Sequence, residues 1–535
     1  MKRIDSNNFR RDSSIGETAM LPMSDDVPMS PKRSTKRTLL IGLGVLVVAG
    51  GVAAAVVLST GKSKSNTASD ASSNANASTP SPTNDYSSVT TAPPPPTSAG
   101  ATTAPPPVKS DPETDPVVLT MLAIGDWGST TGRGDDGTNP GSCCVLYKSG
   151  PNKNQVDTSL PRYKVDYRAQ ESVGKLLGMS AAQLKPARVL SHGDNIYWNG
   201  VGEKDILYRM QETFEKMYSA PALQGVPWLN VAGNHDIGGS AYICGDSDST
   251  FRKCTSTAEM LTYLEKKFTL QAQYVSPNGN RWIMKDHYYV ERVTQGGVTV
   301  DIYNLDTNEA TTHGAQQVCC QCFGAGGSAS QCDNIMPGDP LCAGGDMGMF
   351  NACMEKIQSW ADQSYKGALK DLEASKADFK IINTHYSPQY HMNAPRIEKW
   401  FNLTKNMGVH AWFNGHTHGF NHDLTDWNTH FFQNGAGGGI VSQSSGSVVG
   451  VDGIKPVWVA AGQPYGFMEL SFTKEWMKVQ FVSFDKSWQF NGFTSGDISP
   501  GGIARGHCWF IHKSRDGPGV ECKSSVNGVV GLPTR

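Results

Sequence analysis

Five short polar turns along the chain carry side chains of the types that bind metal ions. Each turn follows a short apolar run and contains aspartate, asparagine or histidine. In chain order they are Gly125-Asp126-Trp127-Gly128, Gly193-Asp194-Asn195-Ile196-Tyr197, Gly233-Asn234-His235-Asp236, Thr384-His385-Tyr386 and Gly415-His416-Thr417-His418. Gathered in one cleft without a cation, these groups would be desolvated charges with no partner, at a cost of several kcal/mol per ion. Each turn alone is an ordinary structural turn, but the five together predict a metal site.

The preceding strands must bring these turns together. Short buried strands are predicted at 117–124, 187–190, 227–231, 379–383 and 409–413. Helical patterns lie between them at 167–177, 204–218 and 395–406. Open α/β sheets bind their ligands beyond the carboxyl ends of the strands, so we expect the five turns to converge there.

Further alternating runs predict antiparallel strands of a second sheet. They lie at 281–290, 298–305, 430–433 and 467–484. The predicted class is therefore α/β, with two stacked sheets flanked by helices.

The five turns resemble those of the calcineurin-like metallophosphoesterases, and within them the purple acid phosphatases of the tartrate-resistant type. The resemblance covers about 117–484 and is strongest in the turns, in 193–201 and in Leu305-Asp306-Thr307. It implies a four-layer α/β/β/α sandwich of two mixed sheets flanked by helices. It also implies a binuclear centre of iron(III) and a divalent iron, zinc or manganese ion.

The resemblance assigns a ligand set to each cation. The iron(III) ligands would be Asp126, Asp194, Tyr197 and His418. The ligands of the divalent ion would be Asp194, Asn234, His385 and His416. Asp194 would then bridge the two cations.

One exchange of ligands points to iron(III). Many metallophosphoesterases carry a ligand histidine two residues after the first aspartate, where this chain has Gly128, and Tyr197 appears three residues after Asp194. A phenolate is a hard anionic donor that suits iron(III) better than zinc or magnesium. The alternative is that Tyr197 is only a packing aromatic.

The implied activity is that of an acid phosphatase, which hydrolyses phosphate monoesters by attack of a metal-bound hydroxide. Iron(III) acidifies water, so an acid optimum is expected. His235 is the candidate general acid, while Asp236 either fixes that histidine or caps a turn. His391 is a candidate for substrate binding, although its spacing departs from the small family members. Small-molecule or protein phosphate esters would be the substrates.

Two other kinds of function remain open. One is a manganese- or zinc-dependent phosphodiesterase or nucleotide hydrolase of the same superfamily, against which Tyr197 argues. The other is a non-catalytic surface protein on this fold, against which the complete ligand set argues. The chain has 47 basic and 49 acidic side chains and a formal charge of −2, so its charge suggests no nucleic-acid partner.

Several nearby residues have structural interpretations. His192, His422 and His430 are expected to pack or to lie on the surface. The glycine run 435–439 lacks the Gly-Lys-Ser/Thr ending of a phosphate-binding P-loop and is expected to be a turn. Trp127 and Trp198 flank the metal turns, where they would either pack or contact substrate.

The 12 cysteines are clustered and even in number, which favours disulfides. Cys244 with Cys254 and Cys508 with Cys522 are plausible pairs, whereas 319–353 allows many connectivities. A zinc knuckle is the alternative for four cysteines, although it would lack the usual C-x-x-C arms. They are Cys319, Cys320, Cys322 and Cys332. The 319–353 segment and a Cys143-Cys144 insertion would rim the cleft.

Composition divides the chain into four parts. A cytosolic disordered tail is expected at 1–37, a transmembrane signal-anchor helix at 38–59, a Ser/Thr/Pro-rich stalk at 60–116 and the catalytic domain at 117–535. The apolar run 39–58 has the ~20 residues that a bilayer requires, and the four basic residues within 32–37 favour a cytosolic N-terminus. A cleaved signal peptide is the alternative.

This topology places the catalytic domain outside the cytosol, in the secretory pathway or at the cell surface, with release by cleavage left open. Two glycosylation sequons, Asn76-Ala77-Ser78 and Asn402-Leu403-Thr404, lie on the same predicted side. The sequence leaves the oligomeric state undetermined.

Overall fold

The computed structural model describes residues 111–128, 151 and 163–531, apart from 240, 248–249, 312, 326–331, 333, 444–445 and 449. These residues belong to one compact unit. None of the helices within them is long and apolar enough to cross a membrane. The predicted tail and anchor, nearly all of the predicted stalk, and the Cys143-Cys144 pair lie outside the described residues.

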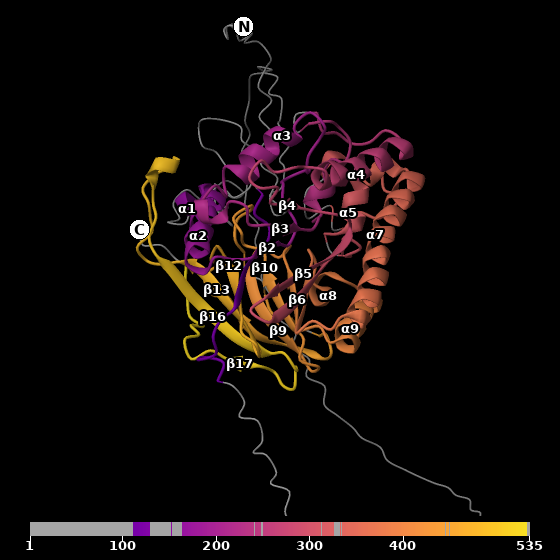
Figure 1. Cartoon of the computed structure of the whole chain (residues 1–535). Coiled ribbons are helices and arrows are strands. Elements are labelled where there is room, and N and C mark those ends of the chain that lie inside the picture. Colours follow the sequence, from indigo (N-terminus) through magenta and orange to yellow (C-terminus); the bar gives the residue numbers. More distant parts are fainter. Residues whose placement is uncertain are drawn as a thin grey trace, which may run out of the picture. The chain divides into compact units, whose positions relative to one another are not determined.

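Two large mixed sheets form the centre of the domain (Figure 1). In the eight-stranded sheet, β1 to β4 are parallel and the other strands are antiparallel. Its order is β17 (Val520–Glu521), β16 (Ile503–His512), β13 (Trp476–Phe484), β12 (Gly466–Phe472), β1 (Leu119–Ile124), β2 (Arg188–Ser191), β3 (Trp228–Asn230) and β4 (Trp282–Ile283).

The second sheet has seven strands, with a parallel centre made of β10, β8, β7 and β6. Its order is β11 (Ile454–Val459), β9 (Phe420–Thr425), β10 (His430–Asn434), β8 (Ala411–Asn414), β7 (Phe379–Asn383), β6 (Val298–Leu305) and β5 (Tyr288–Gln295). A separate ribbon pairs β14 (Gln489–Phe490) with β15 (Ile498–Ser499).

The prediction of two stacked sheets is confirmed, but the assignment of strands to them was partly wrong. The five predicted short buried strands divide between the sheets, and the run 467–484 forms β12 and β13 of the first sheet. The run 281–290 contributes to both sheets, through β4 and β5. Alternation shows that a strand is half-buried, but it does not identify the neighbouring strand.

Aromatic side chains fill the space between the sheets. The Phe379 ring of β7 lies 5.4 Å from that of Phe472 of β12, and the Phe420 ring of β9 lies 4.6 Å from that of Phe481 of β13. These side chains are buried, so hydrophobic burial holds the sheets face to face.

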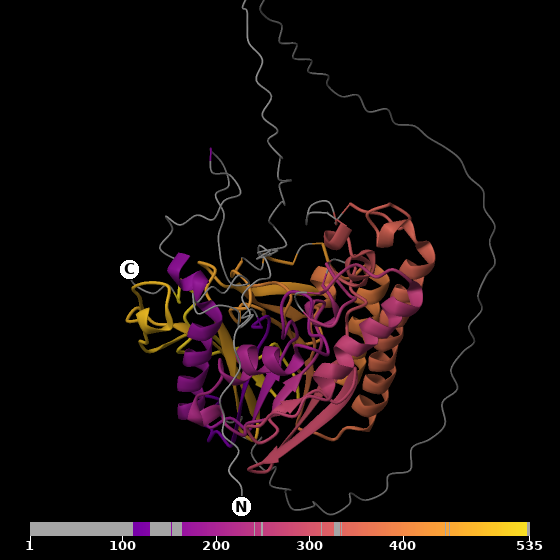
Figure 2. The ribbon, with the colours of Figure 1, turned by 90° about the horizontal axis from the view of Figure 1, so that it is seen from above.

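Helices flank both sheets (Figures 1 and 2). Helix α2 (Ala169–Leu184), preceded by α1 (Tyr163–Tyr167), packs on the first sheet. Helix α7 (Met347–Ala374) packs on β5 and β6, and α4 (Thr257–Ala272) and α9 (Ala394–Met407) lie against α7. The sandwich therefore has the expected helix, sheet, sheet, helix order.

Local signals explain the ends of these helices. The N-caps of α4, α7 and α9 are Ser256, Asp346 and Asn393, and each side chain accepts a hydrogen bond from a backbone N–H of the first turn. Gly408 ends α9 in the left-handed conformation, with φ of 69°. The helix predicted at 204–218 is α-helical only over α3 (Ile206–Arg209). A π-helical turn follows over Met210–Glu215.

Five disulfides staple the described domain. The predicted pairs Cys244–Cys254 and Cys508–Cys522 are confirmed. The cluster pairs as Cys319–Cys353, Cys320–Cys342 and Cys322–Cys332, which join α5 (Ala315–Cys320) and the following loop to α7 and to the segment before it. The zinc-knuckle alternative is therefore wrong, because all four of its cysteines are oxidised.

Candidate metal centre

The five polar turns meet at the carboxyl ends of parallel strands from both sheets. Asp126, Asp194 and Asn234 follow β1, β2 and β3 of the first sheet. His385 follows β7, and the pair His416 and His418 follows β8, in the second sheet. These six side chains are almost completely buried. The expected convergence is therefore present, and it joins the two sheets.

One group of donors surrounds Asp126. Ligand atoms of Asp126, Asp194 and His418 all lie within 4.8 Å of one another. The hydroxyl of Tyr197 lies 3.2 Å from Asp126 Oδ1 and 3.5 Å from His418 Nε2. The four residues that the resemblance assigned to iron(III) therefore stand together.

A second group shares Asp194 with the first. Ligand atoms of Asp194, His385 and His416 lie within 4.8 Å of one another. His385 Nε2 lies 3.2 Å from Asn234 Oδ1, 3.3 Å from His416 Nδ1 and 3.4 Å from Asp194 Oδ2. The four residues assigned to the divalent ion therefore also meet, with Asp194 between the two groups.

The chemistry of this donor set fits two cations. Burial and the adjacent charge of Asp194 raise the pKa of Asp126 well above its ordinary value. Asp194 Oδ2 is buried and accepts no hydrogen bond from the described residues. Two buried carboxylates side by side repel each other, and cations between them would remove that conflict.

The turns adopt backbone conformations that suit an assembled site. Asp126, Asp194 and His416 have φ of 54°, 50° and 68°, in the left-handed region that residues other than glycine rarely adopt. Glycines make room for the carboxylates. A Cβ atom at Gly233 would lie 2.2 Å from Asp194 Oδ1, and one at Gly415 would lie 2.2 Å from Asp126 Oδ2.

Asp236, whose role the sequence left open, ties two ligand turns together. Its carboxylate accepts hydrogen bonds from the backbone N–H groups of Gly233, Asn195 and Ile196 at 2.8 to 3.1 Å. The last two lie between Asp194 and Tyr197. Asp236 therefore fixes the turn after β2 against the turn after β3.

Gly128 stands where many relatives carry a histidine ligand, and no side chain fits at this position. A Cβ atom there would lie 1.7 Å from the carbonyl oxygen of Asn195. The Gly128 carbonyl instead accepts a hydrogen bond from Tyr197 N at 2.9 Å, next to the wholly buried Tyr197 side chain. The close approach of these two turns therefore excludes a histidine at position 128 and also helps to place Tyr197.

The match to one protein-family model covers all five turns. The model described as "Calcineurin-like phosphoesterase" matches residues 119–420, which is more than half of the chain. The chain is a calcineurin-like phosphoesterase.

Distant homologues of this phosphoesterase include tartrate-resistant acid phosphatases type 5. The mouse protein is 26% identical over 255 residues, which cover 46% of this chain and 60% of the mouse protein. The pig protein is 30% identical over 130 residues, which cover 24% of this chain and 29% of the pig protein. The alignments thus span less than two thirds of these relatives. A solved purple acid phosphatase, PPD1 from yellow lupin, aligns at 13% identity and a TM-score of 0.33, covering 72% of this chain and 53% of the lupin chain.

Two histidines border the donor groups of the phosphoesterase. His235 Nδ1 donates to the Trp198 carbonyl at 2.7 Å, and His235 N donates to Asp194 Oδ1 at 3.0 Å. The His391 ring lies 4.7 Å from that of His416, and His391 Nε2 lies 3.2 Å from Thr417 Oγ1. Both therefore lie beside the predicted ligands.

Other residues near the turns have supporting contacts. Trp127 donates from Nε1 to Ser191 Oγ at 2.9 Å and packs among buried aromatics, so it is a packing residue. Trp198 lies edge-on to His235, with ring centroids 5.3 Å apart. The glycine run 435–439 is a structural turn, with Gly437 N and Gly439 N bonded to the carbonyls of Gly125 and Asp126.

Two residues that lie next to the predicted ligands were not singled out from the sequence. The Tyr386 hydroxyl donates to Asn234 Oδ1 at 3.0 Å and lies 2.9 Å from the carbonyl oxygen of His313. The His313 ring lies 5.9 Å from the His416 ring. Tyr386 belongs to the predicted turn Thr384-His385-Tyr386, so its place next to His385 could have identified it as a site residue. His313 lies in an irregular segment before the clustered cysteines, with no periodic pattern to mark it.

Proposed function

We propose that this phosphoesterase hydrolyses phosphate monoesters at a centre of iron(III) and a divalent iron, zinc or manganese ion. The observation that carries the proposal is the meeting of seven donor side chains in two groups that share Asp194. Two cations held there would polarise the phosphoryl oxygens and acidify a water molecule.

Tyr197 is the basis for including iron(III). Its hydroxyl stands between Asp126 and His418, and its ring is fully buried. A phenolate at this point adds a hard anionic donor to the Asp126 group, whereas the His385 and His416 group has two imidazoles and an amide. The unequal donor sets support two different cations.

His235 is the proposed general acid. Its Nδ1–H is held by the Trp198 carbonyl, which fixes the ring and assigns proton transfer to Nε2. The His235 backbone N–H donates to Asp194 Oδ1 at 3.0 Å, which holds the residue beside the proposed bridging carboxylate. A proton delivered from Nε2 to the leaving alkoxide oxygen would complete the cleavage of the ester bond.

We also propose that the domain lies outside the cytosol, behind an N-terminal signal-anchor helix. The five disulfides support an oxidising compartment, because cytosolic thiols are kept reduced.

Metal quantification and hydrolysis assays on the purified full chain test the activity. We expect two metal ions per chain, at least one of them iron, and hydrolysis of an aryl phosphate monoester that is faster at acid than at neutral pH. Asp194→Asn should abolish hydrolysis. Preferential cleavage of a diester without bound iron would favour the manganese or zinc alternative. Absence of both metal and hydrolysis would favour a non-catalytic surface protein.

A further inference from the structure

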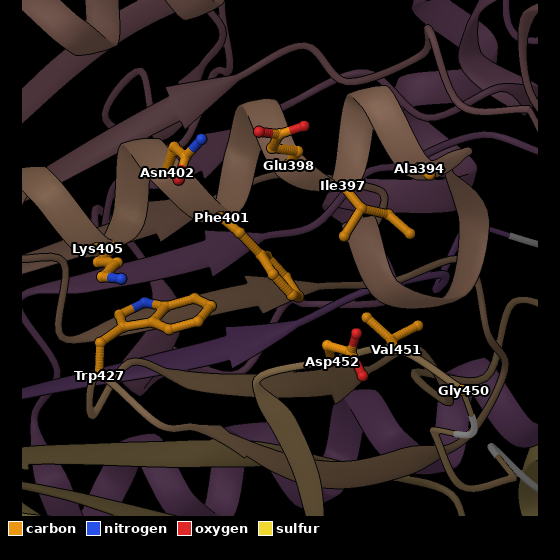
Figure 3. A pocket seen from close by; sticks show the side chains of 10 residues that line it. All are labelled: Ala394, Ile397, Glu398, Phe401, Asn402, Lys405, Trp427, Gly450, Val451 and Asp452. Atoms are coloured by element: carbon orange, nitrogen blue, oxygen red, sulfur yellow. The ribbon is translucent and has the colours of Figure 1, made fainter. Parts of the chain in front are cut away.

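A hollow of about 520 Å³ lies beside helix α9 and shares no residue with the metal centre (Figure 3). Ile397 and Phe401 point from the helix toward Val451 in the facing segment, and Trp427 closes one end. The volume falls within the roughly 300–1,000 Å³ of small-ligand clefts. The hollow therefore has an apolar floor and room for a small organic group.

The rim of the hollow is polar. Glu398, Asn402 and Lys405 follow one another along α9 at spacings of four and three residues, so they share one face of the helix. Asp452 lies on the facing segment. Carboxylates and an ammonium group around an apolar floor match a ligand that has an apolar face and hydroxyl groups at its edge.

One residue on the rim, Asn402, belongs to an N-glycosylation sequon. Asn402 begins the sequon Asn402-Leu403-Thr404, and its side chain is exposed, while Leu403 and Thr404 are buried. A sugar on Asn402 would begin at the mouth of the hollow without displacing any core side chain.

Thr404, the third residue of the sequon, holds the Trp427 side chain in place. Trp427 Nε1 donates to Thr404 Oγ1 at 3.2 Å, and the Trp427 ring lies edge-on to Phe401 with centroids 5.2 Å apart. Lys405 Nζ lies 5.9 Å from the centre of the Trp427 ring. The indole is thus held in place next to the attachment point.

The disulfides supply an independent observation. Five of them in the described domain indicate folding in an oxidising compartment, where asparagine-linked sugars are also attached.

We propose that Asn402 carries an N-linked glycan and that its first N-acetylglucosamine occupies this hollow. The apolar face of the sugar lies against Trp427, and its polar groups lie toward Glu398, Lys405 and Asp452. The glycan thereby covers apolar side chains of α9 and the facing segment, and it stabilises the fold locally.

The test uses the full chain from cells that add N-linked glycans. Mass spectrometry of the 402 glycopeptide measures occupancy, and unfolding midpoints are then compared between three forms. These are the untreated protein, protein trimmed by an endoglycosidase to a single N-acetylglucosamine, and protein stripped by an amidase. We expect high occupancy, equal midpoints for the untreated and trimmed forms, and a midpoint several degrees lower for the stripped form.

Matched variants separate this local effect from general effects of glycosylation. Asn402→Gln should lower the midpoint as stripping does, whereas Asn76→Gln, at the other sequon, should leave it unchanged. Thr404→Ser keeps the sequon and the hydroxyl and should retain both the glycan and the difference in midpoint between trimmed and stripped forms. Trp427→Leu should remove the difference between trimmed and stripped forms. An unoccupied Asn402, or three glycoforms with the same midpoint, would overturn the proposal whatever the phosphatase assays show.

Discussion

The hydroxyl of Tyr197 lies 3.2 Å from Asp126 Oδ1, which places a phenol against the first buried carboxylate of the centre. We predict that Tyr197→Phe removes the visible absorption band of an iron(III) phenolate and lowers kcat by at least about tenfold, a typical loss for metal-site substitutions. Absorption spectra and phosphate-release assays check this. Tyr218→Phe, at a buried tyrosine packed against Trp127, is the matched control and should keep the band. A band that survives Tyr197→Phe would contradict the assignment.

Asp236 holds two ligand turns through backbone hydrogen bonds, so its replacement should lower metal affinity although Asp236 is not a predicted ligand. Asp236→Asn turns an NH₂ group toward backbone donors, and each donor left unpaired costs about 1–3 kcal/mol. We expect a lower unfolding midpoint and metal affinity reduced about 10- to 100-fold. Competition with a chelator measures the affinity.

Asp166→Asn provides the comparison, because Asp166 is a buried carboxylate that accepts from the Tyr465 hydroxyl at 2.6 Å. This variant should lower the midpoint but leave metal affinity unchanged. Equal losses of affinity in both variants would mean that Asp236 acts only through general stability.

Removal of the cations should destabilise the domain, because the Asp126 and Asp194 carboxylates are left side by side. A ligand present at 1,000 times its Kd stabilises the folded state by about 4 kcal/mol. We expect a chelator to lower the unfolding midpoint and added iron and zinc to restore it. In Asp194→Ala the midpoint should no longer respond to the chelator. A wild-type midpoint unaffected by metal removal would count against the site.

Three buried histidines away from the centre should make stability sensitive to acid. His422 Nε2 lies 2.8 Å from His430 Nδ1, and His422 Nδ1 lies 3.0 Å from His507 Nε2. Burial lowers the pKa of His430 to about 3, and it lowers the pKa of His422 and His507 as well. In the unfolded chain a histidine titrates near 6.5.

Below about pH 6.5 the unfolded chain therefore binds protons that the folded chain excludes, and the free energy of unfolding falls as the pH drops toward 3. His430→Gln should reduce this dependence by up to roughly 1.4 kcal/mol per pH unit, the value for one proton. Denaturant unfolding at pH 7, 6, 5 and 4 would measure this dependence. Phe431→Leu should lower stability equally at each pH. Parallel curves for His430→Gln and wild type would refute the prediction.

The sequence was most informative where a residue able to bind a metal directly follows a predicted strand. Asp126, Asp194, Asn234, His385 and His416 each follow a buried strand, and the carboxyl ends of such strands meet at one edge. That rule applied although the strands belong to two sheets. The assignment of 467–484 to the second sheet was wrong because periodicity does not identify pairing partners.

Other features depended on tertiary contacts that local sequence does not encode. The pairing of Cys319 with Cys353 was one of many that the spacing allows. Helix α7 was not predicted: its first residues lie in the cysteine-rich segment 319–353, and no element was assigned to the rest of it. His313 lies near His416 only because the loop after β6 folds back over the site.

The division of the donors between two sheets has a consequence for biosynthesis. Asp126 and His416 are 290 residues apart in the chain, yet the His416 backbone N–H donates to both oxygens of the Asp126 carboxylate. During translation the set of donor side chains remains incomplete until the later half of the domain has emerged. If the proposed cations bind there, high-affinity metal capture would be a late event, and a loaded centre would report that both halves of the polypeptide have docked correctly.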